Sequence, residues 1–192
     1  MSLVKGDPFP HFPSKKMNEF INISYGSNLH PIRLAKRCRS AERIGTAQLY
    51  GWKLAFHKRS KDGSGKCNAM KTNNPEDHIW VAVFRISSED KPNLDRAEGL
   101  GYGYNEERVT VAVSGQDYVG SMYLADQAAI DDSMRPYDWY KSMVVLGAEF
   151  HGFPTAYLEA LQEIEGIPDP DPKRREEQLR IVEEIEAANL RL

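Results

Sequence analysis

The chain has 192 residues, enough for one domain whose core needs no disulfide or metal to hold it together. Its hydrophobic content of 41% and charged content of 28% are typical of a soluble globular protein. A net charge of −3 with scattered Lys and Arg argues against nucleic acid or an anionic membrane as a partner. No stretch approaches the roughly 20 apolar residues of a membrane span. Cys38 and Cys67 lack CxxC spacing and favour a reduced, cytoplasmic protein.

Residues 1–18 contain three prolines and are expected to form an extended lead-in. The first predicted strand covers residues 20–25, where apolar and polar side chains alternate as in a half-buried strand. Gly26-Ser27-Asn28 then favours a tight turn and a helix N-cap, and residues 30–37 predict a short helix with Pro31 in its first turn.

This strand, turn and helix start bring several free backbone N–H groups to one point, which suits the binding of a carboxylate or an oxyanion. Any strand-to-helix junction also needs such residues, and the turn alone favours this plainer interpretation.

The middle of the chain predicts mainly strands. Residues 79–86 (IWVAVFRI) are apolar on both faces and are expected to form a central strand. Leu94 to Glu98 predicts a short helix closed by Gly99. Further strands are expected at residues 42–56, with bends at Gly45 and Gly51, and at residues 67–72, 109–113 and 121–125, with a polar loop at residues 58–66.

The last third of the chain is helical in pattern. Residues 137–149 and 154–164 carry apolar side chains at helical spacing, and a charged helix follows Pro172. Its charge favours a solvated tail helix. This order predicts an α+β protein with a small mixed, strongly curved sheet or barrel, flanking helices and a C-terminal helical segment. We expect a lead-in at residues 1–18, a domain at residues 19–168 and a tail helix at residues 169–192.

Several common catalytic and binding motifs are absent from the sequence. The Gly99-Leu100-Gly101-Tyr102-Gly103 run follows a predicted helix and precedes a strand, the reverse of a dinucleotide fingerprint. Residues 63–66 lack P-loop spacing, no GxSxG elbow occurs, and the five histidines show no metal-binding spacing. We therefore expect no metal site and no cofactor.

Glu98 is the remaining candidate for chemistry. It follows Leu94 and Ala97 and precedes Gly99-Leu100, so its expected surroundings are less polar than those of most glutamates. A carboxyl group in such a place can exchange protons near neutral pH. A glutamate at the end of a helix can equally well face water, and spacing alone leaves the two interpretations open.

Several sequence blocks together resemble the γ-glutamylcyclotransferase (AIG2-like) family. The blocks occur in the family's order and approximate spacing and span residues 19–165. They are Tyr25-Gly26-Ser27-Asn28-Leu29, Ile79-Trp80-Val81-Ala82-Val83, Leu94-Asp95-Arg96-Ala97-Glu98-Gly99, Ser121-Met122-Tyr123-Leu124, Tyr140-Lys141-Ser142, Leu146-Gly147-Ala148-Glu149 and Gly152-Phe153-Pro154-Thr155-Ala156-Tyr157.

The resemblance implies a small β-barrel with helices around it, often a homodimer, and no cofactor. It also implies a reaction in which a small-molecule γ-glutamyl substrate closes on itself, releasing 5-oxoproline and a free amine or amino acid. Glu98 matches the family's catalytic acid/base position, and Tyr25, Gly26, Ser27, Asn28 and Leu29 match its substrate-binding loop, in which we expect the backbone to matter more than the side chains. Tyr123, Tyr140 and, less closely, Tyr104 fall where the family has pocket-lining tyrosines.

Residues 101–104 and 131–136 and Arg85 depart from the better-known members of the family. These departures affect the expected leaving group, which the sequence leaves open among amino acids, amines, glutathione and antibiotic intermediates. Two further hypotheses compete with an enzyme. One is a non-catalytic binding or sensor protein for γ-glutamyl or carboxylate ligands, and the other is an interaction module whose acidic tail helix docks a partner.

Overall fold

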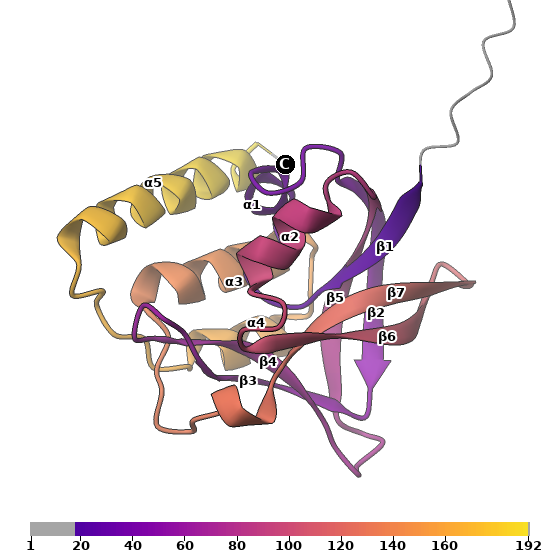
Figure 1. Cartoon of the computed structure of the whole chain (residues 1–192), viewed down its shortest axis with the longest axis horizontal. Helices are drawn as coiled ribbons and strands as arrows, with labels where there is room; N and C mark the ends of the chain where they lie inside the picture. The colour runs from indigo at the N-terminus through magenta and orange to yellow at the C-terminus, as the bar shows by residue number, and fades with distance from the viewer. Residues whose placement is uncertain (1–17, 192) are drawn as a thin grey trace, which may run out of the picture.

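The computed structural model describes residues 18–191, in which a curled five-stranded sheet forms one side of the molecule (Figure 1). The strand order is β2-β5-β1-β7-β6; β1 runs parallel to β7 and all other neighbours are antiparallel. The edge strands β2 and β6 contact each other, so the sheet closes into a half-barrel. The bounds are β1 (Glu19–Ser24), β2 (Glu42–Tyr50), β5 (His78–Ser87), β6 (Tyr104–Val113) and β7 (Gln116–Ala125). The predicted mixed, strongly curved sheet is confirmed.

Strand β5 lies inside the sheet between β2 and β1, as its two apolar faces predict. Its apolar side chains are almost fully buried, except that of Trp80, which is partly buried. Antiparallel pairing places Ile23 of β1 opposite Val83, and the register between β2 and β5 shifts between Arg43 and Gly45. The expected bend at Gly45 is therefore a bulge, and it lets β2 approach β6: a Cβ atom at Gly45 would lie 2.5 Å from Cγ1 of Val113.

The expected strand at residues 42–56 is two strands, because Gly51 turns the chain with φ of 78°. Strand β3 (Trp52–Arg59) pairs with β4 (Gly65–Lys71) in a separate two-stranded sheet. The pairing extends into the segment expected to be a polar loop, so the loop shrinks to residues 60–64. Lys58 thereby becomes a buried strand residue.

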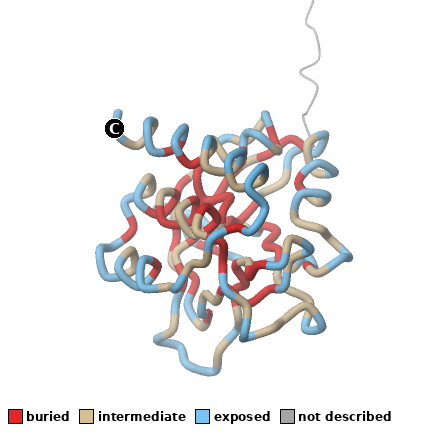
Figure 2. Tube along the Cα trace, turned by 90° about the vertical axis from the view of Figure 1, so that its left-hand side faces the viewer, coloured by how far each residue is buried: buried red, intermediate tan, exposed pale blue. Residues whose placement is uncertain are grey.

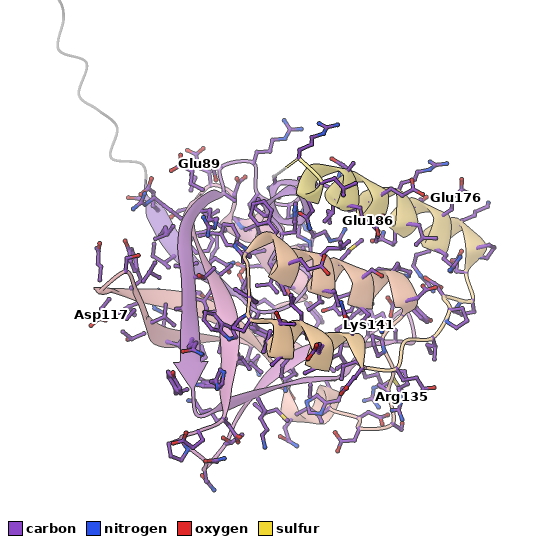
Figure 3. The ribbon with its side chains drawn as sticks, turned by 180° about the vertical axis from the view of Figure 1, so that it is seen from behind. Glu89, Asp117, Arg135, Lys141, Glu176 and Glu186 are labelled. Carbon is purple, nitrogen blue, oxygen red and sulfur yellow. The ribbon has the colours of Figure 1, made fainter. Side chains whose placement is uncertain are left out.

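The helices cover the other side of the molecule. Figures 1 and 3 show α3 and α5 side by side, with α4 beyond α3. The bounds are α1 (Pro31–Ala35), α2 (Lys91–Glu98), a 3-10 turn η1 (Gln127–Ala129), α3 (Asp138–Phe150), α4 (Thr155–Gln162) and α5 (Pro172–Asn189). Gly99 closes α2 in the left-handed conformation with φ of 71°, as predicted. The N-cap of α1 is His30, whose Nδ1 accepts from the N–H of Ile32, so placing the cap at Gly26-Ser27-Asn28 was wrong.

Helix α5 packs on the domain, although its charge favoured a solvated tail. Val182 and Ile185 are buried against the other helices, while Glu176 lies at the outer edge of the molecule (Figure 3). The tube in Figure 2 shows this alternation of buried and exposed turns along the helix. At its start, Asp169 accepts a hydrogen bond from the indole N–H of Trp139. The domain boundary at residue 168 stays a prediction, and the lead-in predicted at residues 1–18 lies outside the described residues except for Asn18. Between residues 18 and 191, no helix combines the length and apolar character that a membrane crossing requires.

Gly147 brings α3 into direct contact with the backbone after β1. A Cβ atom at this position would lie 2.7 Å from Cβ of Leu29 and 3.0 Å from the backbone nitrogen of His30. We expect Gly147→Ala to lower the free energy of unfolding by about 1–2 kcal/mol, because overpacking outweighs the roughly 1 kcal/mol gained in helix propensity. Chemical denaturation measures the change.

Gly166→Ala is the matched control, since a Cβ atom there meets nothing closer than 3.5 Å. Equal stability of Gly147→Ala and wild type would contradict the close packing of α3 on this turn.

Candidate active site

A narrow pocket of about 40 Å³ lies where β1 ends. It collects every site residue expected from the sequence except Leu29, although these residues come from five different elements or their ends. Its lining consists of Asn22, Ile23, Ser24, Tyr25, Gly26, Ser27, Asn28, Cys67, Glu98, Tyr104, Tyr123 and Tyr140. The pocket is therefore bounded by the β1 turn, the end of α2 and a set of tyrosines.

The turn after β1 presents its backbone to this pocket. The N–H of Leu29 bonds to the carbonyl of Gly26 at 2.9 Å, while among residues 18–191 the N–H groups of Gly26, Ser27 and Asn28 find no acceptor. A Cβ atom on Gly26 would lie 3.0 Å from Cβ of Cys67, so a glycine allows the turn to approach β4. Free backbone N–H groups of this kind favour an anionic or carbonyl oxygen as ligand.

Leu29 anchors the turn from behind. Its side chain is buried against Gly147, and its carbonyl accepts a hydrogen bond from Nε2 of His151 at 2.8 Å. Leu29 does not line the pocket. It was expected in the substrate-binding loop, and in the structure it fixes the position of that loop without forming part of the pocket wall.

Glu98 ends α2 with one carboxylate oxygen held and the other free. Asn28 Nδ2 and Arg37 Nη1 both donate to Oε1 at 2.6 Å, and Arg37 also donates to Oδ1 of Asn28 at 2.9 Å. Among the described residues, Oε2 has no partner. These polar contacts, here called the clamp, correct the expectation that the surroundings of Glu98 are weakly polar. The side chain of Asn28 holds the carboxylate, a role that the emphasis on the backbone of the turn did not include.

The tyrosines form neutral walls with engaged hydroxyl groups. Tyr25 donates to the carbonyl of Tyr123, Tyr104 donates to the carbonyl of Cys67 at 2.6 Å, and Tyr140 accepts from the N–H of Cys67 at 3.1 Å. Burial raises the pKa of Tyr25, Tyr104 and Tyr140 well above the usual value, so all three stay protonated. We therefore infer that they shape the pocket and do not act as proton acceptors or donors in the reaction at neutral pH.

Tyr123 connects the pocket wall to a charged network on α2. Its hydroxyl donates to Oδ1 of Asp95 at 2.6 Å, and Nζ of Lys91 binds the same oxygen at 2.6 Å. Burial and the bond to Asp95 raise the pKa of Tyr123. Because α2 also ends in Glu98, this network helps to fix the helix that carries the candidate acid/base.

Two kinds of residue at the site escaped prediction. Asn22 and Ser24 were predicted only as the polar members of an alternating, half-buried strand, yet both are buried, and Oδ1 of Asn22 has no partner among the described residues. A buried polar strand face indicates a binding site, but its burial can be recognised only once the fold is known. Arg37 carried no signal at all, because 61 positions separate it from Glu98.

A wider outer cavity of about 260 Å³ adjoins the narrow pocket and shares four of its residues, including Glu98. Cationic side chains outnumber acidic ones in its lining. The cations are Arg33, Arg37, Lys58, Lys66 and Arg174, and the acids are Asp62 and Glu98. Glu98 therefore stands between a narrow, tyrosine-lined pocket and a basic one.

Comparison with known proteins agrees with this fold. The AIG2-like family model matches residues 78–161. A crystal structure of an uncharacterized human protein has a TM-score of 0.75 and 29% identity, covering 86% of this chain and 99% of that one. A solved structure of a γ-glutamyl cyclotransferase has a TM-score of 0.75 and 27% identity, covering 87% and 99%. The half-barrel with its helices is thus an AIG2-like fold.

Curated relatives identify the enzyme family more specifically. The bovine γ-glutamylcyclotransferase is 30% identical over 157 residues, covering 79% of this chain and 82% of the relative. The human γ-glutamylcyclotransferase is 30% identical over 151 residues, covering 76% and 79%. The chain belongs to the γ-glutamylcyclotransferase family of enzymes.

His151, which holds the turn through Leu29, makes stability depend on pH. Its Nδ1 accepts from Arg43 Nε at 3.2 Å, so the neutral ring fits both of its bonds. Burial lowers the pKa of His151 to about 4, below the value of about 6.5 in the unfolded chain. The unfolded state therefore binds more protons between these values, and stability is lost as the pH falls from about 6.5 toward 4.

We expect this histidine to contribute about 1–2 kcal/mol less to stability at pH 5 than at pH 7. Denaturation curves of wild type and His151→Gln at both pH values measure its share, since the other titrating groups cancel in the difference. A difference between the two proteins that does not change with pH would contradict the prediction.

Proposed function

We propose that the protein is a γ-glutamyl cyclotransferase that releases 5-oxoproline, with Glu98 as its acid and base. The observation that carries the proposal is the clamped carboxylate. Oε1 of Glu98 is fixed by Asn28 and Arg37, while Oε2 and the N–H groups of the neighbouring turn have no partner within residues 18–191. The names of the bovine and human relatives support the same activity.

In this reaction the substrate supplies its own nucleophile. The α-ammonium group gives a proton to Oε2 of Glu98, and the resulting amine nitrogen attacks the γ-carbonyl carbon, forming the new C–N bond of a five-membered ring. The amide C–N bond then breaks as Glu98 returns this proton to the departing nitrogen. The attacking nitrogen loses its second proton through the same carboxylate, so the ring nitrogen keeps one hydrogen and the freed amine leaves as an ammonium ion. One carboxylate thus serves these proton transfers, and no protein nucleophile is required.

The pocket contributes by holding the glutamyl chain in a bent conformation. The N–H groups of Gly26, Ser27 and Asn28 are suited to bind its carboxylate or carbonyl oxygens, and the buried Oδ1 of Asn22 offers an acceptor for its ammonium group. Because ring closure is intramolecular, a correct conformation supplies a large part of the rate enhancement. The fixed Oε1 keeps Glu98 in one orientation throughout.

We expect Glu98→Gln to lower the rate of 5-oxoproline release at least about 100-fold, because an amide cannot accept the proton. The substrate panel contains γ-glutamyl amino acids, γ-glutamyl amines and glutathione, and 5-oxoproline is quantified directly. Glu163→Gln, at the exposed C-cap of α4, is the matched control and keeps full activity. Thermal unfolding of each variant verifies that the fold is intact.

A fully active Glu98→Gln protein would overturn the role of Glu98. If wild type releases no 5-oxoproline from any member of the panel, the cyclotransferase proposal fails. Thermal stabilisation by a γ-glutamyl ligand without turnover would instead identify a binding or sensor protein.

A further inference from the structure

We propose that Arg33 and Lys58 are specificity-determining residues that bind a carboxylate on the leaving group of the substrate. The inference rests on the proposed function, since it concerns the part of the substrate beyond the scissile amide. Glu98 borders both cavities, so a glutamyl group in the narrow pocket would extend its leaving group into the outer cavity. The charges of that outer cavity then decide which leaving groups bind.

Most cations of the outer cavity are already neutralised by the protein. Each of them forms a direct ion pair with a carboxylate, at a distance of 2.8 Å or less. Lys66 pairs with Asp62 at 2.8 Å, Arg37 pairs with Glu98 at 2.6 Å, and Arg174 pairs with Asp169 at 2.5 Å. The side chains of two cations in the lining, Arg33 and Lys58, form no ion pair and no hydrogen bond with any described residue.

Lys58 is an unusual lysine because its residue is only 8% exposed. Its ammonium group lies 4.7 Å from the centre of the Tyr104 ring, which provides a cation–π contact and no compensating charge. Gly103 makes room for it: a Cβ atom there would lie 2.9 Å from Cε and 3.0 Å from Nζ of Lys58. The fold therefore accommodates a nearly buried cation, a group that gains substantially from an anionic ligand.

Arg33 projects from α1 into the same cavity, and its buried Nε has no partner in the described part of the chain. Burial lowers the pKa of Arg33 to about 10 and also lowers that of Lys58, and the charge of Glu98 partly offsets both effects. Arg33 therefore stays cationic at neutral pH, and both side chains lie within electrostatic reach of the reacting carboxylate. A carboxylate near the scissile nitrogen would supply the acceptor that both cations lack.

The test compares γ-glutamyl-alanine with γ-glutamyl-alaninamide, which differ only in the charge of the leaving group. We expect wild type to prefer the acid by 10-fold or more in kcat/KM. Lys58→Met and Arg33→Gln are each expected to lose most of this preference, mainly through a higher KM for the acid. Lys61→Met, at an exposed lysine outside the outer-cavity lining, is the matched control and keeps the preference.

Equal kcat/KM of wild type for the acid and the amide would overturn the inference while leaving the cyclotransferase activity standing. Release of no 5-oxoproline from either compound or from the wider panel would instead remove the proposed function itself. The wild-type comparison does not depend on variant folding, and product inhibition by alanine against alaninamide adds a second test of the same charge. Equal inhibition by the two products would also contradict the inference.

Discussion

The clamp on Glu98 is the contact on which the arrangement of the site depends. Three segments meet in it: the turn after β1 through Asn28, the residues after α1 through Arg37, and the end of α2 through Glu98 itself. Each of the three side chains bonds to the other two, so moving any one segment weakens two hydrogen bonds. Charge-assisted bonds of this kind are stronger than neutral ones, and they fix the carboxylate before a substrate enters.

The half-barrel makes this clamp possible by placing a polar strand end inside the protein. Asn22 and Ser24 are buried at the end of β1, where Nδ2 of Asn22 donates to Oγ of Ser24 at 2.9 Å. A buried polar group without a partner weakens the folded state, so the unpaired Oδ1 of Asn22 has no structural benefit. Such groups concentrate where a ligand completes the hydrogen bonding, which is consistent with the open acceptor facing the narrow pocket.

The sequence predicted the local elements well because their signals are local. The apolar run of β5 and the closure of α2 by Gly99 depend on near neighbours, and both were confirmed. The surroundings of Glu98 were predicted wrongly because its partners Asn28 and Arg37 lie 70 and 61 positions away. Periodicity cannot indicate which distant side chain will face a carboxylate, and the family resemblance supplied positions without supplying their contacts.

The two cations of the outer cavity that have no ion pair among the described residues are better explained by ligand binding than by folding stability. A buried lysine or arginine without a carboxylate partner is less favourable in the folded state than an apolar side chain of similar volume. Lys66 and Arg174 show that this fold does provide partners for cations around the cavity, through Asp62 and Asp169. Within residues 18–191, Arg33 and Lys58 have no such partner, which is therefore hard to attribute to stability. A carboxylate carried by the substrate would supply the missing anionic partner for both Arg33 and Lys58.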